Sequence, residues 1–283
     1  MAVNTWIIVL SCFTYLVESG PLNATRNSNE DSDDFEVKII NGREAEEKEF
    51  PWMVALHFNG KFICSASLIS PSLVMTAAHC VEYENGVEPA TDFFGIVGNI
   101  RHKGPETKIE FSEVISHPEY GAGTEYDIAI LRIAEPLELS DSISPICLPK
   151  AGREFELEYA QAMGWGVTST DSDKPSEILR TTSLGVQPKS LCQLFFAMMI
   201  IAITDRHECA VATSGTGVCF GDSGGPLVYE DAMTGKPVAI GVSSFGTVLG
   251  CGRPLVPNVY TATASYANWI AETAGDNSGI CFV

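Results

Sequence analysis

Residues 221–226 read Gly-Asp-Ser-Gly-Gly-Pro and place a single serine among small residues. Glycines let a backbone turn tightly and let a substrate carbonyl approach it closely. They also let two backbone N–H groups converge to form an oxyanion hole. Because a serine is a poor nucleophile without a general base, the stretch predicts that Ser223 works with a histidine from elsewhere in the chain.

The position of the histidines along the chain decides which fold can use this serine. The stretch fits the G-x-S-x-G nucleophile elbow of the α/β-hydrolases, which place their histidine after the serine. All histidines of this chain precede Ser223; they are His57, His79, His102, His117 and His207. The sequence therefore excludes an α/β-hydrolase.

Two further segments supply candidates for a base and for a group that orients it. His79 lies in the small-residue stretch Met75–Cys80, and Asp127 leads the apolar stretch Ile128–Leu131. A lone histidine is usually a structural residue, and an aspartate at the start of a strand is often only an edge or capping residue. Together, however, the order His79, Asp127, Ser223 matches a known arrangement of the catalytic triad.

Composition limits the function classes. The chain has 283 residues, of which 45% are hydrophobic, and its formal net charge is −19. A surface with this acidity cannot meet nucleic-acid phosphates, so nucleic-acid binding is excluded. Nine cysteines indicate an oxidising compartment.

The body of the chain shows the pattern of an all-β protein. Short apolar stretches such as 51–58 and 237–246 are separated by Gly, Pro, Asn, Asp and Ser, which is typical of strands and turns. Only residues 264–273 predict a convincing helix. Many short strands with one terminal helix predict an antiparallel barrel or sandwich, with 139–153 joining two halves.

The first 38 residues differ from the rest. Residues 6–17 form an uncharged apolar run of twelve, which is shorter than the roughly 20 residues that span a bilayer. Small residues follow, so residues 1–19 predict a signal peptide, with a membrane anchor as the alternative. Residues 20–38 are polar and acidic and predict a flexible leader; Asn23 begins a glycosylation sequon.

Four motifs give a specific resemblance. Ile39–Gly42, TAAHC at 76–80, DIAIL at 127–131 and GDSGGP at 221–226 resemble the trypsin/chymotrypsin family of serine endopeptidases. The resemblance implies two six-stranded antiparallel β-barrels with a C-terminal helix, over a protease domain at 39–275 followed by a tail at 276–283. It implies that His79 is the general base, Asp127 its orienter and Ser223 the nucleophile, with Gly221 and Ser223 N–H groups as the oxyanion hole.

The resemblance also implies activation by cleavage. Lys38 precedes Ile39, as in family zymogens that a trypsin-like enzyme cuts. The new α-ammonium of Ile39 would then pair with Asp222. We therefore expect residues 20–38 to be an activation propeptide.

Family positions predict the residues of the S1 pocket. Gly217 occupies the position where trypsins carry an aspartate, so this position has no carboxylate to bind a Lys or Arg side chain of a substrate. Ser244 and Gly246 match one wall, and Asn258 matches the other, where chymotrypsins usually have glycine. The expected substrate residue is large and apolar, as in arthropod digestive chymotrypsins. Elastase-like and collagenolytic specificities are the alternatives.

The resemblance implies three disulfides, Cys64–Cys80, Cys192–Cys209 and Cys219–Cys251. For Cys147 and Cys281, the alternatives are a mutual bond, two free thiols, or an intermolecular bond. Within the Cys192–Cys209 loop, residues 194–203 (LFFAMMIIAI) form an unusual apolar run. It is either extra packing against the second barrel or an exposed patch for a partner.

These features predict a secreted serine endopeptidase made as a zymogen, with peptide and protein substrates, an activating trypsin-like protease and protein inhibitors as partners. We expect a monomer with no cofactor and no metal, and contact with neither nucleic acid nor membrane. The alternatives are a non-catalytic protease-like binding protein and a regulatory cascade protease.

Overall fold

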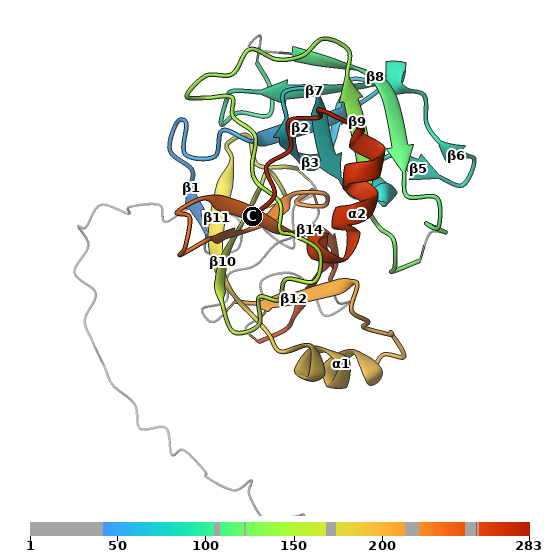
Figure 1. The fold of residues 1–283 in the computed structure, drawn as a ribbon, viewed down its shortest axis with the longest axis vertical. Coiled ribbons are helices and arrows are strands. Elements are labelled where there is room, and N and C mark those ends of the chain that lie inside the picture. Colours follow the sequence, from blue (N-terminus) through green and yellow to red (C-terminus); the bar gives the residue numbers. More distant parts are fainter. Residues whose placement is uncertain are drawn as a thin grey trace, which may run out of the picture. The chain divides into compact units, whose positions relative to one another are not determined.

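Two antiparallel β-barrels of six strands each form the body of the protein (Figure 1), which confirms the predicted fold. The computed structural model describes residues 42–104, 108–121, 123–167, 174–212, 221–246, 253 and 255–283. The predicted signal peptide at 1–19 and the predicted propeptide at 20–38 lie outside these ranges. All described residues belong to one unit of the chain.

The first barrel closes in the order β2-β3-β4-β9-β8-β7. Its strands are β2 (Met53–Phe58), β3 (Lys61–Ser70), β4 (Leu73–Thr76), β7 (Phe93–Val97), β8 (Lys108–Ser116) and β9 (Ala129–Ile133). At the start of β8, buried Ile109 and Phe111 alternate with exposed Lys108 and Glu110. This period of two turns one face of the strand to the core and the other to water. Near this barrel lie the short pair β5 (Glu82–Tyr83) and β6 (Gly86–Val87) and the 3₁₀ turns η1 (Ala78–Cys80) and η2 (Ala90–Asp92).

The second barrel consists of six strands in the order β11-β10-β13-β14-β15-β12, which the pairing of β11 with β12 closes. The strands are β10 (Tyr159–Gly164), β11 (Arg180–Val186), β12 (His207–Val211), β13 (Pro226–Glu230), β14 (Pro237–Phe245) and β15 (Asn258–Ala262). Strand β1 (Arg43–Glu44) adds to the outside of β11. Residues 134–158 connect the two barrels, as the sequence predicts for 139–153.

Two α-helices accompany the barrels. Helix α1 (Lys189–Ala197) lies at the end of the second barrel that is farther from the first (Figure 1). Helix α2 (Thr263–Ala274) confirms the predicted terminal helix, and Gly275 follows it with a φ of 77° that glycine adopts without strain. The hydroxyl of Tyr266 in α2 accepts a hydrogen bond from the Tyr126 N–H at 3.0 Å. The helix that follows the second barrel therefore packs against a loop of the first. Neither helix, nor any other within the described ranges, has the length and apolar character needed to cross a membrane.

The C-terminal tail is fixed to the connection between the barrels. Cys147 and Cys281 form a disulfide, so the mutual bond is the alternative that the structure shows. Beside it, the Leu148 N–H donates to the Cys281 carbonyl at 2.8 Å and the Val283 N–H donates to the Leu148 carbonyl at 3.0 Å. The tail thus pairs with the connection as a short parallel strand.

Removing this disulfide is expected to destabilise the protein. The double variant Cys147→Ser, Cys281→Ser should lose about 2–4 kcal/mol of unfolding free energy, because the bond restricts the unfolded chain. Urea unfolding followed by circular dichroism measures the loss. Met233→Ser, at a side chain that is 94% exposed, serves as the control and should change little. An unchanged urea midpoint in the double variant would contradict the structural role of the tail.

Candidate active site

His79 differs from the other four histidines in its exposure. Its side chain is 32% exposed, at the turn η1 that follows β4. The other four are at most 8% exposed; they are His57, His102, His117 and His207. Burial lowers the pKa of each of these four imidazoles. The histidine that the sequence singles out is therefore the one that a substrate can reach.

Asp127 contacts His79 and is only 3% exposed. Its carboxylate accepts hydrogen bonds from His79 Nδ1 at 2.8 Å and from the His79 backbone N–H at 2.9 Å. The hydroxyl of Ser244 donates a third hydrogen bond to the same carboxylate at 2.5 Å. With Nδ1–H held by Asp127, the other ring nitrogen, Nε2, is the one left to act as a base.

The hydrogen bonds decide the charge of Asp127. Burial raises the pKa of its carboxyl, but the His79 side chain, Ser244 and the His79 N–H together outweigh burial and leave the pKa below its usual value. The carboxylate is therefore charged at neutral pH. Since the folded pKa is depressed, its stabilising effect is present above the unfolded pKa and is lost as the pH falls through the folded one.

Ser223 lies in a turn that is bound to both barrels. Its carbonyl accepts a hydrogen bond from the Ser65 N–H of β3 at 2.9 Å, and the Gly224 N–H donates to the Ser243 carbonyl of β14 at 2.8 Å. A Cβ on Gly224, which has a φ of 76°, would collide with Thr76 Oγ1 and lie 3.2 Å from the Ala77 N. The serine turn is thus placed against the residues that lead into His79 and beside the residue that precedes Ser244.

The residues before the serine turn also need close backbone approach. Gly221 has a φ of 95°, and a Cβ there would lie 3.1 Å from Gly166 Cα. Asp222 is 1% exposed and accepts a hydrogen bond from the Gly166 N–H at 2.8 Å. A Cβ on Gly166 would lie 2.6 Å from the Asp222 carboxyl. The glycines on either side of Trp165 therefore make the space for this buried acid.

The predicted S1 residues fall into three groups. Gly246 and Asn258 face each other, because a Cβ on Gly246 would lie 3.3 Å from Asn258 Oδ1. The hydroxyl of Ser244 donates to Asp127, and the place of this residue in the pocket wall stays a prediction. Gly217 lies outside the described residues, as do Lys38 and Ile39.

One disulfide lies next to His79 and a second lies in the second barrel. Cys64 in β3 is bonded to Cys80, next to His79, and Cys192 in α1 is bonded to Cys209 in β12. Cys219 and Cys251 lie outside the described residues. The sulfurs of Cys64 and Cys80 lie close to the His79 ring. Because these sulfurs are bonded to each other, they offer no thiolate to a metal ion.

Sequence reasoning missed the polar residues that support the site. Ser65 donates from its hydroxyl to the Gly221 carbonyl at 3.2 Å, and Thr76 donates to the Ser65 carbonyl at 3.0 Å. Thr261 donates from its hydroxyl to the Asp127 carbonyl at 2.8 Å. Each lies in a strand whose sequence is mostly apolar. A Ser or Thr within such an apolar stretch was the signal that could have identified it.

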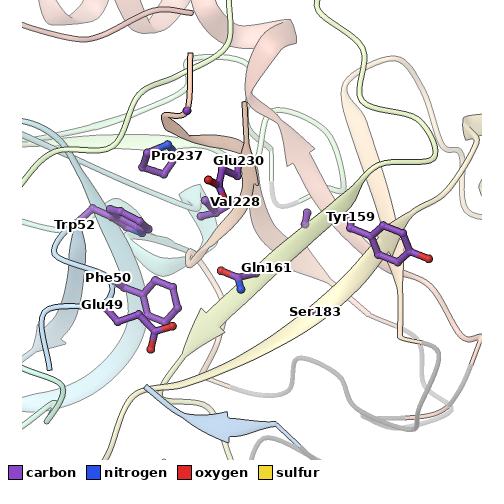
Figure 2. A pocket seen from close by; sticks show the side chains of 11 residues that line it. Glu49, Phe50, Trp52, Tyr159, Gln161, Ser183, Val228, Glu230 and Pro237 are labelled. Carbon is purple, nitrogen blue, oxygen red and sulfur yellow. The ribbon is translucent and has the colours of Figure 1, made fainter. Parts of the chain in front are cut away.

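A cleft of about 410 Å³ lies elsewhere, on the outside of the second barrel (Figure 2). Phe50 and Trp52 face Gln161, Val228 and Glu230 across it. Gln161 and Val228 are partners in the pairing of β10 with β13. The predicted site residues do not line this cleft, so it is separate from the candidate active site.

Known proteins that resemble this chain include transmembrane serine proteases and a clotting-factor subunit. The family model described as Trypsin matches residues 39–270. Transmembrane protease serine 7 of Mus musculus is 35% identical over 84% of this chain and 29% of its own length. Clotting factor G beta subunit of Tachypleus tridentatus is 34% identical over 83% of this chain and 79% of its own length.

Transmembrane protease serine 11B of Homo sapiens is 34% identical over 84% of this chain. The chain spans 56% of the length of that human protein and less of the mouse one. The match of the family model over most of the chain and the two-barrel fold lead to one conclusion: the chain belongs to the trypsin family of serine proteases.

Proposed function

We propose that this protein is a secreted endopeptidase, made as a zymogen, that cleaves after large apolar residues. The observation that carries the proposal is the His79–Asp127 pair, in which a buried carboxylate holds Nδ1 of an accessible imidazole. The serine turn, bound between β3 and β14, supports Ser223 as the nucleophile beside this pair.

In the proposed reaction, Ser223 Oγ attacks the substrate carbonyl and gives its proton to His79 Nε2. Asp127 holds the ring in the required tautomer and stabilises the imidazolium that forms. The N–H groups of Gly221 and Ser223 stabilise the oxyanion. His79 then protonates the leaving amine, and water repeats the same steps on the acyl-enzyme.

Activation is proposed to act through Asp222. Its buried carboxylate lies against the Gly166 N–H, and cleavage after Lys38 would offer it the α-ammonium of Ile39. An α-amino group has an ordinary pKa of about 8, which a carboxylate partner raises. The pairing is then present below the ordinary pKa and is lost as the pH rises through the raised one.

Specificity is proposed to follow from Gly217, Gly246 and Asn258. Gly217 offers no carboxylate to a basic residue, and Gly246 leaves space for a large side chain. Asn258 takes up part of the pocket with a polar group. The alternative specificities for a pocket with these residues are elastase-like and collagenolytic cleavage.

A cascade role is the second candidate, because the Tachypleus tridentatus relative is by name a clotting-factor subunit and this chain spans 79% of it. A cascade enzyme cleaves few bonds in few proteins, whereas a digestive enzyme degrades denatured proteins widely. Digestion of casein and of native plasma proteins, compared by mass spectrometry, separates the two.

Ser223→Ala is expected to lower kcat/KM for a Phe peptide substrate by at least about 10⁴-fold, because the covalent step is lost. Ser183→Ala, on the exposed face of β11, is the control and should keep full activity. A Ser223→Ala protein that retained a tenth of the activity would overturn the enzyme proposal.

The purified full chain is expected to be inactive until trypsin cuts it after Lys38. Lys38→Ala should stay inactive under the same treatment, since the ammonium of Ile39 is never released. Peptide hydrolysis and N-terminal sequencing measure both steps. Full activity of the uncut wild-type chain, or activation of Lys38→Ala by the same trypsin treatment, would contradict the activation mechanism.

Gly246→Val is expected to narrow the S1 entrance. Relative to the wild-type protein, kcat/KM should fall about 100-fold for a Phe substrate and change little for an Ala substrate, within the range seen for pocket volume changes. An unchanged Phe-to-Ala ratio would show that Gly246 does not line the pocket.

A further inference from the structure

Helix α1 and the turn after it expose an unusual number of large apolar side chains. Leu191 is 56% exposed, Leu194 69%, Met198 76% and Ile200 96%. The first three are spaced by three and four residues, which places them on one helix face. These four side chains are called the α1 patch below.

The opposite face of α1 is already buried. Phe196 is fully buried and Ile203 is 6% exposed, in a cluster with Cys192 and Val259. The Phe196 ring lies 5.8 Å from the ring of Phe245 in β14. The apolar run 194–203 therefore packs on the second barrel with one face and is exposed on the other. An apolar helix face is normally buried, so packing on the barrel explains only one face of this helix.

Charge sets the α1 patch apart from the rest of the protein. Residues 190–204 contain no charged side chain, in a chain whose net charge is −19. Lys189, just before this run, is paired with Asp205 at 3.3 Å. The patch is therefore a neutral, apolar area on an acidic protein.

Backbone strain adds to the exposure at the tip. Ile200 has a φ of 60°, a conformation that β-branched residues rarely adopt. Asn or Gly would relieve the strain and remove the exposed apolar group. An isoleucine that is both strained and 96% exposed is consistent with a contact that uses its side chain.

The size and charge of the α1 patch decide what covers it. A stable dimer buries about 800 Å² per partner, from roughly 20–30 residues a side, whereas the patch has four large side chains. A second copy would also bring two strongly acidic chains together. A neutral lipid surface requires neither an extended matching interface nor opposite charge, and the helix lies at the end of the second barrel that is farther from the first (Figure 1).

We propose that the α1 patch docks on the surface of a zwitterionic lipid bilayer, with Leu194, Met198 and Ile200 entering the boundary between headgroups and acyl chains. The contact is peripheral and revises the expectation from sequence that the protein meets no membrane. It is independent of the proposed catalytic function. Because the protein is acidic, anionic lipids weaken the contact at low ionic strength.

The test is flotation of the full chain with phosphatidylcholine vesicles. The patch variant is Leu194→Ser, Met198→Ser, Ile200→Asn, and we expect it to bind at least 10-fold less than the wild-type chain. The matched control, Leu139→Ser, Leu157→Asn, Met233→Ser, removes three exposed apolar side chains elsewhere and should bind as the wild type. Thermal unfolding checks that all three proteins are folded.

Replacing a fifth of the phosphatidylcholine by phosphatidylserine should weaken binding in low salt, and added salt should restore it. Absence of wild-type binding, or equal binding by the patch variant, overturns the proposal. Sedimentation equilibrium of the full chain and the KM of the trypsin-treated protein for casein, both measured without vesicles, identify the other occupants. A patch-dependent dimer, or a patch-dependent KM, with no vesicle binding would assign the surface to a second copy or to protein substrates instead.

Discussion

The buried carboxylate of Asp127 is the interaction on which the site and the junction of the barrels depend. A charge that is 3% exposed is costly to bury without hydrogen bonds. Here His79, from the first barrel, supplies two donors and Ser244, from the second, supplies one. Thr261 of β15 binds the carbonyl of the same residue. One residue thus joins both barrels and orients the imidazole.

The serine turn satisfies a second constraint, which is space. Gly224 has a φ of 76° and leaves no room for a side chain beside Thr76 and Ser65. The Gly225 N–H donates to the Asp222 carbonyl at 2.9 Å, so the turn also closes on itself. Small residues are required here because two barrels and a buried acid approach the same few backbone atoms. The same closeness explains why Ser223 has its position fixed by backbone contacts to β3 and β14.

Much of the fold could be predicted from the sequence, because the strands are short and the turn residues between them are distinct. The pairing of His79 with Asp127 could also be inferred, since chain order and a specific resemblance both point to it. The contact of Ser244 with Asp127 could not, because its neighbours Phe245 and Gly246 led to its prediction as a pocket-wall residue and because a hydroxyl rotates freely. The Cys147–Cys281 bond was one of several alternatives, because it joins segments 134 residues apart. The exposure of Ile200 could not be predicted, because the composition of the apolar run around it favours burial.

The most direct measurement of the role of Asp127 is the rate at which a phosphonate that reacts with activated serines labels the trypsin-treated protein. The site of labelling is found by peptide mapping, and the rate is compared between the wild type and Asp127→Asn. If Asp127 holds His79 as the base for Ser223, the label lies on Ser223 alone and the variant reacts about 10³–10⁴-fold more slowly. Labelling at another residue, or an equal rate in the variant, would contradict this arrangement.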